Sequence, residues 1–544
     1  MKKYFSYIII VILASILFIH SIGTSPLFDW DEINFAESAR EMIVSGDYLR
    51  VQINYQPFWE KPPLFFWMQV VSMKIFGINE FAARFPNAIC GIVTLLVFYH
   101  LGSKMRNRKF AFLWVLLYVS SFLPHLYFKS GIIDPWFNLF IFLGIYYLSD
   151  FLENIQVNQK KSSLVVSGIF TGLSILTKGP VGLLIVLLTY IVYIILNKGK
   201  GFVALKYYFQ WVLTVLAITL IWFGLEIFQH GWWFINEFFS YQVRLAKTED
   251  AGHGGFPLYH FVVLFFGCFP ASIFLLNRPT ESSTVSSGQV FKKMMWASLI
   301  VILTVFSLVK TKIIHYSSFA YFPLVYLATE SLFHIIEHKS DWRKSNRALL
   351  FVIYLIWASI FILLPILFIN VDWLKQLASK DQFALANLNA NVYWGYFYLV
   401  SGIIFVIGGL TAYFLFSRSI QKGIFMLLIT STITIQSQLT FFVPQIELYT
   451  QDAAIEFFKS LRGKDVYVRA LGYKSYAPYF YAQVNPPPTN EAYDIHWLIY
   501  GEVEKPVYLV TRLDRKAQVM RDYGEQLKIL YEKNGFVFLE RKNY

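Results

Sequence analysis

Charged residues are scarce in this chain of 544 residues: only 15% are charged, whereas 56% are hydrophobic. This excludes an ordinary soluble protein, in which about a quarter of the residues are charged. The two cysteines, Cys90 and Cys268, lie in apolar runs and lack the spacing of a metal site or a disulfide framework. The sequence has no internal repeat, P-loop, G-x-S-x-G motif or zinc-finger spacing. We therefore expect no nucleotide cofactor.

Long apolar runs are abundant instead. A run of about 20 apolar residues crosses a bilayer core of about 30 Å as a helix. We expect the first run to be a retained span, because no small-x-small cleavage site precedes Asp29. The sequence thus predicts a polytopic α-helical membrane protein with about 13 spans, at residues 4–22, 81–103, 110–127, 132–150, 163–176, 180–197, 205–227, 257–276, 294–310, 314–336, 348–370, 392–416 and 423–443.

The net charge of +13 is distributed by topology. Basic residues cluster at the N-terminus and in alternate short turns, so the positive-inside rule predicts a cytoplasmic N-terminus and no nucleic-acid partner. Thirteen spans then carry the C-terminus to the outer face. Five basic residues break the pattern by lying in outer segments, and this makes them candidates for function: Lys61, Lys129, Lys178, Arg244 and Lys312.

Two segments outside the spans are long enough to fold. The first outer loop, residues 23–80, predicts an amphipathic helix over 30–44 and an interfacial helix over 64–78; a third such helix is predicted over 231–246. After residue 444 the charge rises and short β-type runs appear at 466–468, 507–510 and 536–539, with helical stretches at 451–461 and 515–528. We predict a membrane domain over 1–444 and a small α/β domain over 445–544.

Acidic residues of the outer segments are candidate catalytic groups. Asp29 and Glu32 have capping-box spacing, which explains both as the start of a helix. Asp31 falls on the apolar side of that helix, where a carboxylate can act as a general base or bind a metal. Asp134 precedes Pro135 and either caps the fourth span or completes an acidic pocket with Asp31.

Basic and aromatic residues of the same segments are candidate substrate ligands. Lys61 follows Glu60 in the aromatic segment that begins at Phe58, so it is either a surface partner of Glu60 or a phosphate ligand. Lys178 is either a snorkelling lysine or a ligand for an anion.

Three further outer residues are ambiguous in the same way. Lys312 and Tyr316, four residues apart, can face one phosphate, although tyrosine is common at membrane interfaces. His253 lies with Arg244 beside a glycine-rich loop and is either solvated, a proton shuttle or a metal ligand.

Several of these motifs together resemble one family. Asp31-Glu32, Glu60-Lys61-Pro62, Asp134-Pro135, Thr177-Lys178-Gly179-Pro180, the loop at Gly252-His253 and the segment from Lys312 to Tyr316 occur in the order found in the bacterial aminoarabinose transferases that modify lipid A. These enzymes belong to the GT-C superfamily with the protein O-mannosyltransferases. The resemblance covers residues 20–330, and Ile33-Asn34-Phe35 departs from the family pattern, which leaves the sugar and the acceptor open.

The resemblance implies a GT-C fold and a glycosyltransferase that uses an undecaprenyl-phosphate-linked sugar. Asp31 and Asp134 inherit the places of essential acids, with Glu32 beside them. The resemblance further implies that Lys61 and Tyr316 hold the carrier phosphate and that Lys178 contacts substrate. We group Arg244, Lys312 and Phe58 with these substrate-binding residues. Glu60 and His253 match positions associated with a divalent metal, zinc or magnesium.

The function predicted from all of this is transfer of a sugar from the lipid donor to a lipid or glycan acceptor, such as lipid A, on the periplasmic side of the bacterial inner membrane. The protein is expected to act as a monomer. Two alternatives stay open at this point. One is a protein O-glycosyltransferase of the same superfamily, and the other is a flippase or transporter of lipid-linked sugars.

Overall fold

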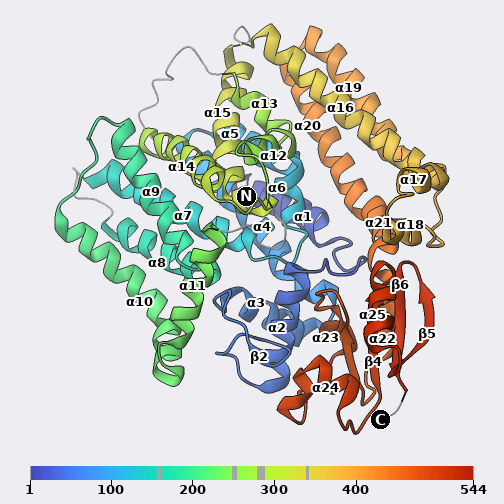
Figure 1. Cartoon of the computed structure of the whole chain (residues 1–544). Coiled ribbons are helices and arrows are strands. Elements are labelled where there is room, and N and C mark those ends of the chain that lie inside the picture. The colour runs from blue at the N-terminus through green and yellow to red at the C-terminus, as the bar shows by residue number, and fades with distance from the viewer. Residues whose placement is uncertain (1, 156–160, 248–253, 278–287, 339–341, 543–544) are drawn as a thin grey trace.

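The computed structural model describes residues 2–155, 161–247, 254–277, 288–338 and 342–542. Most of these residues are helical. A bundle of long helices forms the larger part, and helices α2 and α3 lie beside the C-terminal sheet at one end of it (Figure 1). The predicted class, a polytopic helical membrane protein with a small C-terminal α/β region, is confirmed.

Every predicted span contains a helix. Eight helices or continuous helix pairs of the described chain are long and apolar enough to cross a membrane. The remaining five predicted runs hold helices that are shorter, less apolar or divided in two. The helices are α1 (Lys2–Ile19), α4 (Glu80–Met105), α5 (Arg108–Val119), α6 (Phe122–Tyr127), α7 (Asp134–Asn154), α8 (Lys161–Lys178), α9 (Val181–Leu196), α10 (Leu205–His230), α12 (Tyr259–Gly267), α13 (Ala271–Leu275), α14 (Gln289–Leu308), η2 (Ile314–Ala320), α15 (Tyr321–His338), α16 (Lys344–Ile369), η3 (Tyr396–Leu399), α19 (Val400–Arg418), α20 (Ile420–Ser437), η4 (Gln438–Phe442) and α21 (Val443–Thr450).

The three predicted helices outside the spans are present. They are α2 (Asp31–Ser45), α3 (Leu64–Phe76) and α11 (Trp233–Lys247), and a short hairpin, β1 (Gln52–Ile53) and β2 (Gln56–Pro57), separates the first two. The capping prediction for Asp29 is wrong: α2 starts at Asp31 without a side-chain cap, and the Asp29 carboxylate accepts from the amide of Tyr476 instead. α2 is also buried all round from Glu32 to Met42, so its polar face meets protein and not water.

The C-terminal region forms a four-stranded sheet in the order β3-β4-β6-β5. β3 (Tyr467–Ala470) is parallel to β4 (Val507–Arg512), and β6 (Phe536–Arg541) is antiparallel to β4 and to β5 (Leu527–Lys533). The predicted helix over 515–528 is too long, since it stops at Tyr523 and β5 follows. The other elements are α17 (Val371–Leu377), α18 (Gln382–Asn387), α22 (Asp452–Ser460), α23 (Ala477–Ala482), η5 (Asn490–Tyr493), α24 (Ile495–Tyr500), η6 (Leu513–Arg515) and α25 (Lys516–Tyr523).

The first loop and the C-terminal sheet share one hydrophobic core. Phe35 of α2 and Phe66 of α3 belong to the same buried cluster as Phe458 of α22 and Phe538 of β6. Main-chain contacts strengthen this junction, because the amide of Leu27 donates to Tyr481 Oη at 2.7 Å and its carbonyl accepts from Gln451 at 2.8 Å. The segment that leads to Asp31 is therefore held on one side by the C-terminal region.

Candidate active site

Five of the predicted site residues meet at helix ends on one face of the bundle. Asp31 and Asp134 are the first residues of α2 and α7, and Lys178 is the last residue of α8. Lys61 lies just before α3, and Tyr316 lies in η2. Helix ends bring these groups to a common level because α7 and α8 are antiparallel neighbours. Acids and bases that are far apart in sequence thus form one charged cluster.

Asp134 and Lys178 form the tightest ion pair of this cluster. Lys178 Nζ lies 2.6 Å from Asp134 Oδ1, and the two side chains are 14% and 3% exposed. Ser318 Oγ donates to the same carboxylate oxygen at 3.2 Å. The ammonium also lies over the rings of Phe137, at 5.5 Å, and Tyr316, at 5.8 Å. Asp134 therefore orients Lys178 beside Tyr316 and does not cap α7.

Asp31 is the more accessible acid. Its carboxylate is 39% exposed, and its Oδ2 lies 3.5 Å from His315 Nε2, so the two form an ion pair when the imidazole is protonated. Lys61 interacts electrostatically with Asp31, Asp134 and Lys178. Burial lowers the pKa of the Lys61 ammonium, although Glu60 and Asp31 oppose that shift. An accessible carboxylate beside a partly buried cation can accept a proton from one molecule while the cation holds an anion.

Helix α11 covers this cluster through Tyr241. Its hydroxyl donates to Glu60 at 2.9 Å, and its ring lies 5.6 Å from Lys61 Nζ and 5.1 Å from the Arg244 guanidinium. Arg244 is exposed at the edge of the group. The predicted Glu60, Lys61 and Arg244 thus gather around one aromatic ring.

An apolar cavity opens directly beside the charged cluster. Its volume is about 540 Å³. One end is polar and presents Lys61, Lys178 and Tyr316. The rest is lined by side chains of α9, α11 and α14 and their flanks: Pro180, Val181, Leu183, Leu184, Leu187, Phe239, Gln242, Val243, Val305, Phe306 and Val309, with Phe137 of α7. A molecule with an anionic head and a long apolar tail fits such a cavity.

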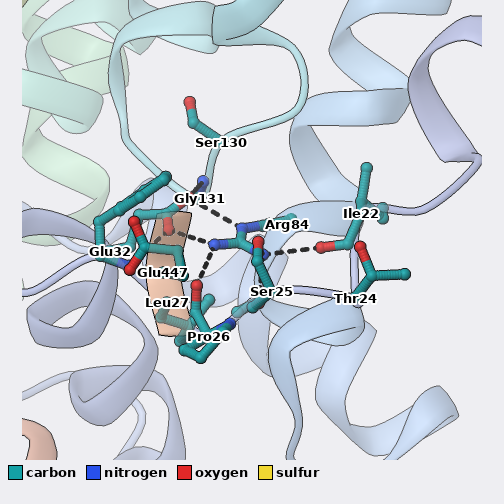
Figure 2. A network of polar contacts seen from close by, with 12 residues as sticks. Ile22, Thr24, Ser25, Pro26, Leu27, Glu32, Arg84, Ser130, Gly131 and Glu447 are labelled. Atoms are coloured by element: carbon teal, nitrogen blue, oxygen red, sulfur yellow. Dashed lines mark hydrogen bonds and ion pairs between the residues drawn. The ribbon is translucent and has the colours of Figure 1, made fainter. Parts of the chain in front are cut away.

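Glu32, predicted as a catalytic acid, takes a structural position. It is 2% exposed and pairs with Arg84 of α4 through two hydrogen bonds of 3.0 and 2.7 Å. It also accepts from the amides of Phe28 and Gly131. Arg84 donates in addition to the carbonyls of Ile22, Ser25 and Pro26, so one guanidinium joins the end of α1 to the start of α2 (Figure 2). Glu32 therefore holds the start of α2, next to Asp31, through a buried ion pair.

Three other residues singled out by the sequence make structural contacts outside the charged cluster. Lys312 is 5% exposed and donates to the carbonyls of Phe306 and Ser307, which end α14; burial lowers its pKa. Lys129 caps the C-terminus of α1 in the same way. Phe58 packs against the core shared by the first loop and the C-terminal sheet. These three contacts stabilise the fold around the site.

Of the two predicted metal ligands, Glu60 and His253, only Glu60 lies in the part of the chain that the structure describes. There, no group of three or more His, Cys, Asp and Glu side chains is placed to hold a metal ion. Glu60 is engaged by Tyr241 and stands beside the Lys61 cation, and His253 lies outside the described residues. A divalent ion stays a prediction, which metal analysis of the purified protein would test.

Sequence reasoning missed three residues of the cluster. His315 faces Asp31, Ser318 donates to Asp134, and Tyr241 joins Glu60 to Lys61. The available signal was the adjacency of His315, Tyr316, Ser317 and Ser318 in one outer turn, where hydrogen-bonding groups are concentrated.

Known proteins share the fold of this chain and part of its sequence. A family model described as dolichyl-phosphate-mannose-protein mannosyltransferase matches residues 60–223. Across 99% of its length the chain superposes on 98% of ArnT from Cupriavidus metallidurans bound to undecaprenyl phosphate, with a TM-score of 0.77 and 17% identity. The chain has the GT-C fold.

Sequence relatives point in the same direction. The undecaprenyl phosphate-alpha-4-amino-4-deoxy-L-arabinose arabinosyl transferase of Shewanella sediminis is 25% identical over 346 residues, which are 62% of this chain and 61% of the relative. That of Photorhabdus laumondii is 25% identical over 291 residues, or 53% and 52% of the two chains. The match thus spans about half to three fifths of the curated relatives. The predicted resemblance to the lipid A aminoarabinose transferases is confirmed.

Proposed function

We propose that this GT-C protein is a membrane glycosyltransferase that moves a sugar from a polyprenyl-phosphate donor to an acceptor of the cell envelope. The observation that carries the proposal is the cavity of about 540 Å³, which is apolar along α9, α11 and α14 and is also lined by Lys61, Lys178 and Tyr316. A polyprenyl tail matches the apolar part, and its phosphate matches the cations. The relatives named for undecaprenyl-phosphate sugars and the ArnT complex with undecaprenyl phosphate support the same donor class.

The donor's phosphate is the leaving group in this mechanism. The bond between the anomeric carbon and the phosphate oxygen breaks, and the electron pair leaves with the oxygen. The ammonium groups of Lys61 and Lys178 and the hydroxyl of Tyr316 stabilise the charge that develops there. Asp134 keeps Lys178 in place through the 2.6 Å ion pair, so Asp134 is a positioning residue.

The acceptor oxygen attacks the anomeric carbon from the opposite side and inverts it. If the acceptor is a hydroxyl, Asp31 takes its proton, since Asp31 is the accessible carboxylate beside the phosphate ligands. If the acceptor is a phosphate, no base is needed, and Asp31 stabilises positive charge on the sugar. The products are a glycosylated acceptor and the free polyprenyl phosphate.

The reaction is proposed to occur on the periplasmic face of a bacterial inner membrane. The basic turns support this orientation, because Lys292 and Lys293 begin α14 while Phe306 near its other end lines the donor cavity. The N-terminus is then cytoplasmic and the C-terminal sheet periplasmic. An acceptor such as lipid A fits this location, and a protein acceptor is the alternative that the mannosyltransferase family model favours.

Transfer in detergent tests the proposal. Purified protein is incubated with a radiolabelled undecaprenyl-phosphate sugar and lipid A, and the labelled product is separated by chromatography. We expect Asp31→Asn to lower turnover by about 10²–10³-fold with little change in donor binding. The exposed Asp372→Asn serves as a control and should leave turnover unchanged. Near-normal turnover of Asp31→Asn would remove Asp31 from the chemistry, and label that stays on the donor in every reaction would favour a flippase.

A further inference from the structure

A second cavity lies at the opposite ends of the helices that form the donor cavity. It has a volume of about 450 Å³. α14 begins beside it and ends beside the donor cavity, and α9 runs between the two in the reverse direction. Its lining comes from the ends of α9 and α13, the first part of α14 and the middle of α15: Leu196, Leu275, Asn277, Lys292, Lys293, Trp296, Ile300, Leu327, Glu330 and Ser331. The two cavities therefore open toward opposite leaflets of the membrane.

The charges of this second cavity do not balance. Glu330 Oε2 pairs with Arg106 at 2.9 Å, and Lys292 Nζ lies farther from the same oxygen, at 3.5 Å. Lys293 donates to the neutral amide oxygen of Asn197 at 2.7 Å. One carboxylate is thus shared by two cations while a third cation interacts with a neutral group. The lining retains positive charge that an anion can neutralise.

A buried donor in the lining also lacks an acceptor. Asn277 is 1% exposed, and its Oδ1 accepts from the amide of Arg343. Among the residues that the structure describes, its Nδ2 has no hydrogen-bond partner. A buried donor without an acceptor destabilises the folded state. Together with the two lysines, this amide favours a ligand that carries several acceptor oxygens.

The mouth of the cavity has the character of a membrane interface. Leu196 and Ile300 are 48% and 42% exposed, as expected of side chains that meet lipid tails. Trp296 follows Lys293 by one helical turn, and tryptophan is enriched at the level of lipid headgroups. Lysines at the rim, a tryptophan below them and aliphatic side chains beyond match a headgroup continued by acyl chains.

We propose that this cavity binds the phosphate headgroup of an anionic glycerophospholipid from the leaflet on the basic face. Lys292 and Lys293 neutralise the phosphate, Asn277 donates to one of its oxygens, and the acyl chains lie along Leu196 and Ile300. Basic pockets between membrane helices on the cytoplasmic side hold anionic headgroups in this manner. The site is separate from the chemistry, and it stands whether or not the protein transfers a sugar.

Native mass spectrometry tests this assignment on the full chain in a neutral detergent. Phosphatidylglycerol is titrated against the protein, with phosphatidylcholine as the uncharged comparison. Each interfacial lysine contributes about a fivefold change in affinity for anionic lipid, so Lys292→Gln with Lys293→Gln should weaken phosphatidylglycerol binding by roughly 30-fold. Lys292→Arg with Lys293→Arg should retain it. Glu330→Gln should tighten it by about fivefold, which a merely structural role for this cluster does not predict.

A matched control removes the same charge elsewhere. Lys344 and Lys422 are exposed near the starts of α16 and α20, outside the cavity. Lys344→Gln with Lys422→Gln should bind phosphatidylglycerol within twofold of the unchanged protein. An equal loss in this control, unchanged binding in the Lys292/Lys293 variant, or equal affinity for phosphatidylcholine would overturn the assignment. Undecaprenyl phosphate that displaces phosphatidylglycerol only when both lysines are present would overturn the choice of a glycerophospholipid.

Discussion

The ion pair between Asp134 and Lys178 allows a prediction that separates stability from chemistry. Lys178→Met leaves the Asp134 carboxylate, which is 3% exposed, with the Ser318 hydroxyl as its closest donor. Breaking a buried pair in this way costs about 3–5 kcal/mol. Asp134→Asn leaves the Lys178 ammonium, which is 14% exposed and lies over two aromatic rings. A cation–π contact with each ring stabilises the remaining ammonium by about 0.5–1 kcal/mol. The unfolding free energy of this variant should therefore fall by only about 2 kcal/mol.

The double variant completes the cycle. Asp134→Asn with Lys178→Met removes both charges, so its loss of unfolding free energy should be smaller than the sum of the single losses by at least about 1 kcal/mol. Turnover should behave differently. Lys178→Met removes a ligand of the leaving phosphate and should lower turnover by about 10²–10³-fold, and the double variant should be no more active.

Two measurements check the cycle: denaturant unfolding in mixed micelles and the radiolabel transfer assay. Stabilities that add within about 0.5 kcal/mol would contradict the ion pair itself. A double variant with the turnover of the unchanged protein would show that the pair serves folding alone. The reasoning about the leaving group would then be refuted, even if the fold is correct.

Two further perturbations have clear signs. Arg84→Met leaves the Glu32 carboxylate, which is 2% exposed, without its cation, and should lower the unfolding free energy in denaturant by about 3–5 kcal/mol. Adding Glu32→Gln to this variant should restore part of the lost stability. No gain in stability would contradict the Arg84–Glu32 network. Burial lowers the pKa of Lys61, so the unfolded chain binds more protons between that lowered pKa and the ordinary value near 10.4. Stability should therefore rise with pH in this window while affinity for the donor falls, as isothermal titration would detect. Donor affinity that stays constant up to pH 10.4 would remove Lys61 from phosphate binding.

Part of the site was predictable because its basic residues depart from the positive-inside rule. Lys61, Lys178 and Arg244 lie in segments predicted to face outward, where basic residues are rare, and all three gather at the cavity or on Tyr241. The same signal also selected Lys129 and Lys312, which cap helix C-termini. A basic residue that departs from the positive-inside rule is expected to have an anionic or polar partner. The rule does not tell whether that partner is a substrate phosphate or the carbonyls at a helix end.

The misassigned residues depend on contacts between distant segments. Glu32 reads as a capping or catalytic acid because nothing in residues 23–45 reveals Arg84, which lies 52 positions later. The burial of α2 follows from the C-terminal sheet, more than 400 residues away. β5 was missed because an edge strand carries charges on its exposed positions, and Lys528, Glu532 and Lys533 obscure its β pattern. Local patterns thus located the helices, and long-range packing decided which acid remained accessible.

Trp30, the residue before Asp31, stores backbone strain that should be measurable. Its φ of 96° is a conformation that glycine adopts easily and other residues adopt at a cost of about 1–3 kcal/mol. The ring is held by Lys474, 4.7 Å from its centre, and by Tyr476. Trp30→Gly and Trp30→Ala both remove these contacts, so their difference isolates the backbone term. Trp30→Gly should be more stable than Trp30→Ala by about 1 kcal/mol in denaturant unfolding, the reverse of the usual order.

The same pair of substitutions at exposed Val44, inside α2, should show the usual order, with alanine more stable. If alanine is also the more stable residue at position 30, the start of α2 is unstrained, and Asp31 owes its position to the Arg84–Glu32 network alone.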